Sequence, residues 1–135
     1  MAVPPPVTGV LETVLYYTDQ ARAEQFYREI LGFRLLGKEP GRHLFFRAGS
    51  SMFLLFDSKA TSKGGSATPA HGASGSVHSC FVVSQQDYDR WREYLVLRDI
   101  PIEQEVGWNE EGRSFYFRDP DNNLLEIANM DFWPR

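Results

Sequence analysis

The sequence is poor in cysteine and in basic charge and has no long apolar run, and each shortage excludes a class of protein. Cys80 is its only cysteine, so no disulfide can form within the chain and we expect a reducing compartment. The 14 Lys and Arg residues are outnumbered by 18 Asp and Glu residues, for a formal net charge of −4. No basic stripe is present, which argues against nucleic acid as a partner. No apolar run has the length of a membrane span, so we expect no membrane partner.

The first residues, MAVPPPV, also lack the basic region and apolar core of a signal peptide. The three prolines exclude a helix there and predict a flexible or extended arm over residues 1–8. With no sign of secretion, nucleic-acid binding or membrane insertion, we expect a cytoplasmic protein whose partner is a small molecule.

What is present is the composition of a folded domain, with 42% hydrophobic and 14% aromatic residues in a chain of 135. Its first part, about residues 9–57, alternates strand and helix patterns. A strand is predicted over 10–17, followed by a helix that begins after Asp19 and ends at Gly32. Three further strands are predicted over 33–36, 41–46 and 52–56.

The same order returns after a linker, residues 58–76, that is rich in Ser, Gly, Ala and Thr. Module two, about 77–130, has a predicted strand at 77–83, a helix after Ser84 and a strand at 100–106. Two strands around Phe115 and Glu126, joined by an Asp-Pro-Asp-Asn-Asn turn, complete it. The prediction for residues 1–135 is therefore a single α+β domain made of two βαβββ modules.

Three ionisable residues interrupt apolar strand patterns: Glu12, His78 and Glu126. Glu12 and His78 occupy equivalent positions in the two modules, so folding one module onto the other would bring them together. One imidazole and two carboxylates suit a divalent metal such as Zn, Fe, Mn or Ni. The alternatives are a solvated or Arg/Lys-paired Glu12 and a hydrogen-bonded core histidine at position 78.

Other side chains are weaker candidates for the functional site. Tyr116 and Arg118 share one face of a strand and could orient an anionic substrate, whereas the alternative for Arg118 is a structural pair with Asp119 or another carboxylate. His71 could reach the site from the linker as part of a lid, or lie on the surface.

Two further side chains have simpler predicted positions. His43 is expected to face solvent, and Trp108 to line an apolar pocket or join the core.

Several stretches resemble the vicinal oxygen chelate superfamily, which includes glyoxalase I, bleomycin-resistance proteins, fosfomycin-resistance thiol transferases and extradiol dioxygenases. These are FYREILGF at 26–33, GSVHSCFVV at 75–83 and FYFRDPDNNLLEI at 115–127. The resemblance implies two βαβββ modules curled into a half-open barrel around a metal. It places the family's metal ligands on Glu12, His78 and Glu126, with a homodimer expected.

The function that this resemblance implies is a metal-dependent lyase, isomerase or dioxygenase that chelates a small oxygen-rich substrate. Glu12 and Glu126 are the candidate catalytic bases, and Tyr116 and Arg118 the candidate substrate-binding residues. The alternative is a non-catalytic protein that sequesters a ligand, like the bleomycin-resistance proteins. Glyoxalase I has a fourth ligand that would fall within residues 52–56, where no side chain of this chain can bind a metal.

Overall fold

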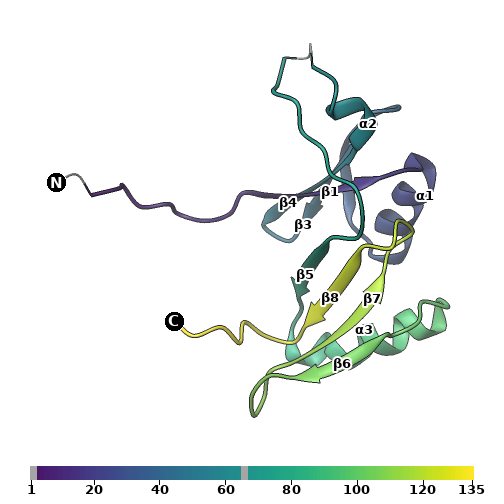
Figure 1. Cartoon of the computed structure of the whole chain (residues 1–135). Helices are drawn as coiled ribbons and strands as arrows, with labels where there is room; N and C mark the ends of the chain where they lie inside the picture. The colour runs from purple at the N-terminus through teal and green to yellow at the C-terminus, as the bar shows by residue number, and fades with distance from the viewer. Residues whose placement is uncertain (1–2, 65–66) are drawn as a thin grey trace. The chain divides into compact units, whose positions relative to one another are not determined.

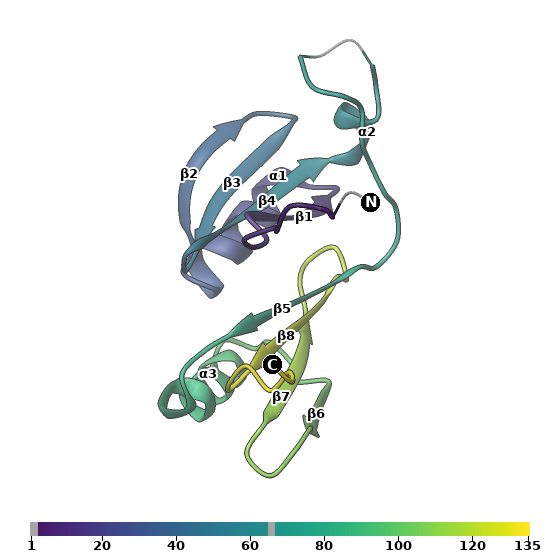
Figure 2. The ribbon, with the colours of Figure 1, turned by 90° about the vertical axis from the view of Figure 1, so that its left-hand side faces the viewer.

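The computed structural model describes residues 3–64 and 67–135, which form two compact units, each built on a four-stranded sheet (Figures 1 and 2). Unit one comprises Met1–Gln20 and Phe33–Gly72. Unit two comprises Ala21–Gly32 and Ala73–Arg135. The helix of module one thus belongs to the same compact unit as module two. Among the helices described, none is long and apolar enough to cross a membrane.

Unit one is a mixed sheet with the order β1-β4-β3-β2. Its strands are β1 (Glu12–Tyr17), β2 (Arg34–Glu39), β3 (His43–Ala48) and β4 (Ser51–Asp57). β1 runs parallel to β4, and the other pairs are antiparallel. Alternation along the strands places one set of side chains, including Leu15, Leu44 and Leu55, in the core.

Unit two repeats this topology with the order β5-β8-β7-β6. Its strands are β5 (His78–Val82), β6 (Gln104–Gly107), β7 (Arg113–Arg118) and β8 (Leu124–Ala128). Helix α3 (Gln85–Leu97) begins at Ser84, whose side chain accepts a hydrogen bond from the Asp87 amide. α3 packs on one face of the sheet, where the ring of Tyr88 contacts that of Phe115.

The helix of module one begins as α1 (Gln20–Gln25) and continues as a π-helical turn, η1 (Phe26–Ile30). Within unit two, η1 is fixed to the β7–β8 turn by Tyr27, whose hydroxyl donates to the Asp119 carboxylate at 2.7 Å in a buried contact. Asp119 also accepts from the backbone amides of Asp121 and Asn123, so one carboxylate organises the β7–β8 turn. Asn122 takes the left-handed conformation in this turn, with φ of 64°. The turn that leads into β8 is therefore held by the helix of the other module.

The predicted α+β class and the two βαβββ modules are confirmed, and several element boundaries need correction, among them the strand predicted over 41–46, which is β3 (His43–Ala48). The linker predicted over 58–76 begins with a short helix, α2 (Ser58–Thr61), because the side chain of Asp57 accepts the Lys59 amide as an N-cap. Residues 65 and 66 of that linker lie outside the described part. The strand predicted over 100–106 begins only at Gln104, since Pro101 cannot donate to a sheet ladder.

Two further corrections concern β2 and the N-terminal arm. The strand predicted over 33–36 is longer and runs from Arg34 to Glu39, with a register shift between Leu35 and Gly37. A bulge of this kind lets a strand continue past an irregular pair. The extended arm runs to Leu11, so β1 begins at Glu12 and not at residue 10.

Candidate functional site

The face of the unit two sheet opposite α3 carries the polar side chains that the sequence singled out. Cys80 on β5, Glu126 on β8 and Tyr116 on β7 are direct partners across three neighbouring strands and form one row. His78 lies two residues before Cys80 and therefore projects from the same face. Glu126 is only 5% exposed, whereas the His78 side chain is 47% exposed, so this site is open to solvent on the histidine side.

His78 and Glu126 are in contact, with 3.1 Å between Nε2 and Oε1. The other ring nitrogen of His78, Nδ1, lies 2.8 Å from the carbonyl oxygen of Leu124. Both nitrogens thus face acceptors, although a neutral imidazole has only one N–H to donate. A shared hydrogen or a bound cation between Nε2 and the carboxylate would satisfy this contact. The pair therefore has the donor chemistry of a cation site.

Glu126 also acts on its two neighbours in the row. Burial, and then the negative charge of Glu126, raise the pKa of the Cys80 thiol to about 12. The pKa of Tyr116 is raised mainly by burial, with a further contribution from Glu126. Both groups stay protonated at neutral pH, so they can donate hydrogen bonds but do not compete with His78 for a cation as anions.

The residues present fit a metal as two of its ligands. A hydrogen bond from Nδ1 to the Leu124 carbonyl would fix the tautomer and ring orientation that leave Nε2 free to bind a metal, which is the usual support of a ligating histidine. Within residues 3–64 and 67–135, no group of three or more His, Cys, Asp or Glu side chains is close enough to hold a metal ion. Within the described residues, two of the three predicted ligands, His78 and Glu126, lie in contact.

Glu12, the third predicted ligand, is the first residue of β1 in unit one and is exposed. Its strand pairs with β4 in the same parallel manner as β5 pairs with β8, since Glu12 is opposite Met52 and His78 is opposite Leu124. Glu12 and His78 therefore occupy equivalent positions of the two sheets. By the same correspondence, Leu54 in unit one stands where Glu126 stands in unit two.

Arg118 is already bound within unit two. Its Nε and Nη2 donate to the two carboxylate oxygens of Glu103, each at 3.0 Å. Its Nη1 donates to the Ser76 hydroxyl and the Asn122 carbonyl. This is the structural pairing that the sequence left open as an alternative, with Glu103 as the carboxylate. Tyr116 remains beside Glu126, while the guanidinium of Arg118 ties the end of the linker to the β7–β8 turn.

The two other histidines are less exposed than the sequence suggested, because their rings pack on aromatic side chains in unit one. His43, expected in solvent, stacks on Phe45 with 3.9 Å between ring centroids. His71 lies 2.7 Å through Nδ1 from the Tyr16 hydroxyl and contacts the Phe56 ring edge-on. A histidine isolated in a Ser/Gly-rich linker carries no sequence signal for such a contact.

Trp108, expected to line an apolar pocket or join the core, is 49% exposed and does not belong to the core. Its indole Nε1 donates to the Ser114 hydroxyl at 2.9 Å, and its ring stacks on Phe132. The aromatic residues Phe132 and Trp133 near the C-terminus were the sequence signal from which a stacking partner for Trp108 could have been predicted.

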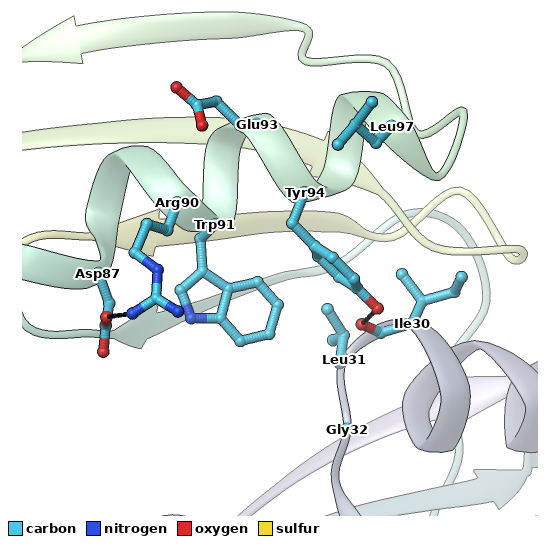
Figure 3. Close-up of a pocket in the computed structure, with 9 residues that line it drawn as sticks. All are labelled: Ile30, Leu31, Gly32, Asp87, Arg90, Trp91, Glu93, Tyr94 and Leu97. Atoms are coloured by element: carbon cyan, nitrogen blue, oxygen red, sulfur yellow. Dashed lines mark hydrogen bonds and ion pairs between the residues drawn. The ribbon is translucent and has the colours of Figure 1, made fainter.

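A pocket of about 690 Å³ lies in the helical layer of unit two, between η1 and α3 (Figure 3). Trp91 and Tyr94 of α3 line it, and the Tyr94 hydroxyl donates to the Ile30 carbonyl at 2.8 Å. Arg90, at its rim, is paired with Asp87. Because α3 covers the sheet face opposite His78 and Glu126, this pocket is separate from the polar row.

Known proteins resemble the chain over most of its length. The family model described as the Glyoxalase/Bleomycin resistance protein/Dioxygenase superfamily matches residues 9–127. Virulence protein STM3117 of Salmonella typhimurium is 32% identical over 120 residues, which cover 85% of this chain and 79% of that protein.

Solved structures also resemble the chain over most of its length. A lactoylglutathione lyase from Agrobacterium tumefaciens has a TM-score of 0.87 at 35% identity, covering 92% of this chain and 95% of that one. The fosfomycin resistance protein FosX from Listeria monocytogenes, in a variant complexed with Mn(II) and dihydroxypropylphosphonic acid, has a TM-score of 0.70 at 20% identity, covering 94% of each chain. The second likeness shows the fold alone. The protein belongs to the glyoxalase/bleomycin resistance protein/dioxygenase superfamily.

Proposed function

We propose that this protein is a divalent-metal-dependent enzyme that binds a small oxygen-rich substrate, with lyase chemistry as the first candidate. The observation that carries the proposal is the His78–Glu126 pair, whose Nε2 and Oε1 atoms lie 3.1 Å apart and are placed to share a bound cation. The likeness to a lactoylglutathione lyase, at 35% identity, supports lyase chemistry over oxygenase chemistry.

In this proposal His78, Glu126 and Glu12 are the metal ligands. A bound divalent cation would polarise a substrate carbonyl or hold two adjacent substrate oxygens. The nearly buried position of Glu126 favours this role, because a carboxylate removed from water is stable only when it is paired or bound to a metal. Glu12 contributes from the equivalent position of unit one, where its exposed carboxylate is available.

The chain's own groups would then handle the proton and orient the substrate. Glu126 or Glu12 would accept a proton from the carbon next to the polarised carbonyl and return it in the second half of the reaction. Tyr116, which stays protonated and lies beside Glu126, would donate a hydrogen bond to a substrate oxygen. Arg118 would support this arrangement indirectly, by holding residue 76 against the β7–β8 turn.

A ligand-sequestering protein without catalysis is the second candidate, and it would not require a cation at His78 and Glu126. The test measures turnover of two substrate classes by protein loaded with Mn²⁺, Zn²⁺, Fe²⁺ or Ni²⁺. The first class is the hemithioacetals that 2-oxoaldehydes form with thiols, and the second is the catechols. We expect turnover of a hemithioacetal that stops on chelation and falls by about 10²–10⁴-fold in Glu126→Gln. The Glu111→Gln variant, changed at an exposed loop carboxylate, is the matched control. Tight binding of an organic ligand by chelated protein, without turnover of either class, would favour sequestration instead.

A further inference from the structure

The pocket between η1 and α3 lies wholly within unit two and is separate from the polar row (Figure 3). Its volume of about 690 Å³ is in the range of small-molecule sites. Trp91 and Tyr94 form its aromatic wall, and the buried side chain of Leu31 lines it from the end of η1. Aromatic and apolar walls with a few polar groups at the rim are the usual composition of a ligand site.

The two rings of this wall meet at a right angle. The centroids of Trp91 and Tyr94 are 5.6 Å apart and their planes are inclined by 88°, so the rings form a corner. Figure 3 shows both side chains directed from α3 toward the end of η1. Tyr94 is fixed there because its hydroxyl donates to the Ile30 carbonyl at 2.8 Å, and the Arg98 guanidinium lies over its ring. Within the described part of the chain, no Arg or Lys lies over the ring of Trp91, which leaves its π face for a cation from outside.

The charges around the pocket favour a cation over an anion. The helix formed by α1 and η1, residues 20–30, ends at the pocket, and the C-terminal end of a helix carries a partial negative charge. Three charged residues line the pocket, and two of them, Asp87 and Arg90, pair with each other at 2.8 Å. The third is Glu93 at the rim, which forms no ion pair with another described residue. One carboxylate and one helix end, both negative, are therefore left without a partner charge.

From these observations we propose that the pocket binds a small organic cation with a quaternary ammonium group, of the kind that choline carries. The methyl groups of such a cation would pack into the Trp91–Tyr94 corner, and its charge would face the indole. A primary ammonium has three N–H donors to satisfy, whereas a quaternary ammonium has none. The corner suits the second kind, because the Ile30 carbonyl is already used by Tyr94. This site does not depend on the metal proposed at His78 and Glu126 and goes beyond the proposed function.

The test compares two molecules of the same shape, choline and its uncharged carbon analogue 3,3-dimethyl-1-butanol, in the presence of a chelator. Binding to the full chain is followed by NMR, through the Trp91 indole N–H and the backbone amides of Leu31 and Gly32. We expect choline to bind about tenfold more tightly than the alcohol. Equal affinities for the two molecules, or no binding of choline, would overturn the proposal.

Ring variants separate the indole from the rest of the pocket. Trp91→Leu retains an apolar side chain without a π face and should abolish the preference for choline. Trp91→Phe retains a smaller π face and should keep part of the preference, which distinguishes loss of the ring from a folding defect. The matched control is Trp133→Leu, changed at a tryptophan that is 74% exposed, and it should keep the full preference. A preference that survives Trp91→Leu would contradict the site.

Charge variants test the electrostatic part of the proposal. Arg90→Gln removes the one cation among the lining residues and should raise the affinity for choline about twofold. Glu93→Gln should lower it about twofold, and shifts in the opposite directions would contradict the assignment of a cation.

Vesicles of phosphatidylcholine present the same quaternary ammonium group on a lipid surface. The chain should not sediment with them, because the proposed ligand is a free small molecule. Sedimentation with the vesicles, without binding of free choline, would overturn that assignment.

Discussion

The two units share one sheet topology but differ in the chemistry of the open face. In unit one the central row is Val14, Leu54 and Phe45, which are direct partners across β1, β4 and β3. The row at the equivalent position of unit two is Cys80, Glu126 and Tyr116. The same backbone register therefore carries an apolar row in one unit and a row with a carboxylate, a thiol and a phenol in the other.

This difference shows that the fold alone does not create the site. The only ionisable candidate ligand that the two sheets share by position is the residue at the start of the first strand, Glu12 in unit one and His78 in unit two. Unit two adds Glu126, which makes it the main source of the proposed ligands, and the Leu124 carbonyl of the same unit fixes the orientation of His78. Function on this scaffold thus depends on a few side chains at defined register positions.

The largest effect should come from exchanging the central residues of the two rows. Leu54→Glu would place a carboxylate without a matching histidine at a position that is 7% exposed, and should lower the free energy of unfolding by about 3 kcal/mol or more. Glu126→Leu, measured in chelator, should leave stability unchanged or raise it by about 1–2 kcal/mol, because it replaces a buried charge with an apolar group. Urea denaturation of both variants measures the contrast. An equal loss of unfolding free energy in both variants would contradict the proposed difference between the two rows.

A smaller effect is expected at two buried tyrosines that anchor the units differently. Tyr27 donates to the Asp119 carboxylate, whereas the Tyr17 hydroxyl in unit one accepts from the neutral side chain of Gln20. Tyr27→Phe should cost about 1.5–3 kcal/mol, because its hydrogen bond is to a charged group. Tyr17→Phe is the matched control and should cost about 0.5–1 kcal/mol. Thermal unfolding at neutral pH compares them, and a cost for Tyr17→Phe as large as that for Tyr27→Phe would contradict the special role of the Asp119 turn.

The smallest effect is a pH dependence that unit one should contribute through His43. Burial among aromatic rings lowers the pKa of His43 in the folded protein below its ordinary value of 6.5. The unfolded chain then takes up this proton first as the pH falls, so stability should decrease as the pH drops below about 6.5. In His43→Gln this part of the decrease in stability with falling pH should be absent. Urea denaturation between pH 5 and 8 measures it, and an identical slope in the variant would rule His43 out as the cause.

Much of this architecture could be predicted from the sequence because the signals are local. Alternating apolar residues, the Ser84 cap, the Gly32 helix end and the Asp119 turn chemistry depend on neighbours along the chain. Glu126 was recognisable for the same reason, since a carboxylate inside an apolar strand pattern needs a partner.

Features that depend on distant contacts could not be predicted in this way. The bond from Trp108 to Ser114, the engagement of Arg118 by Glu103, and the packing of His71 on Phe56 join residues whose approach is set by sheet register and loop paths. The start of β6 at Gln104 was not predicted, because Pro101 was placed near the start of an edge strand over 100–106.

We propose that Glu126 and His78 bind a metal, with Glu12 as the third ligand that the sequence predicts, and metal content tests this proposal most directly. The measurement is elemental analysis of the purified protein, reconstituted with Mn²⁺, Zn²⁺, Fe²⁺ or Ni²⁺, beside Glu126→Ala, His78→Ala, Glu12→Ala and the control Glu111→Ala. We predict about one equivalent per chain in wild type and control, its loss in the Glu126 and His78 variants while the fold persists, and weakened retention in the Glu12 variant. No metal in any of the proteins, or equal metal in all five, would contradict the claim.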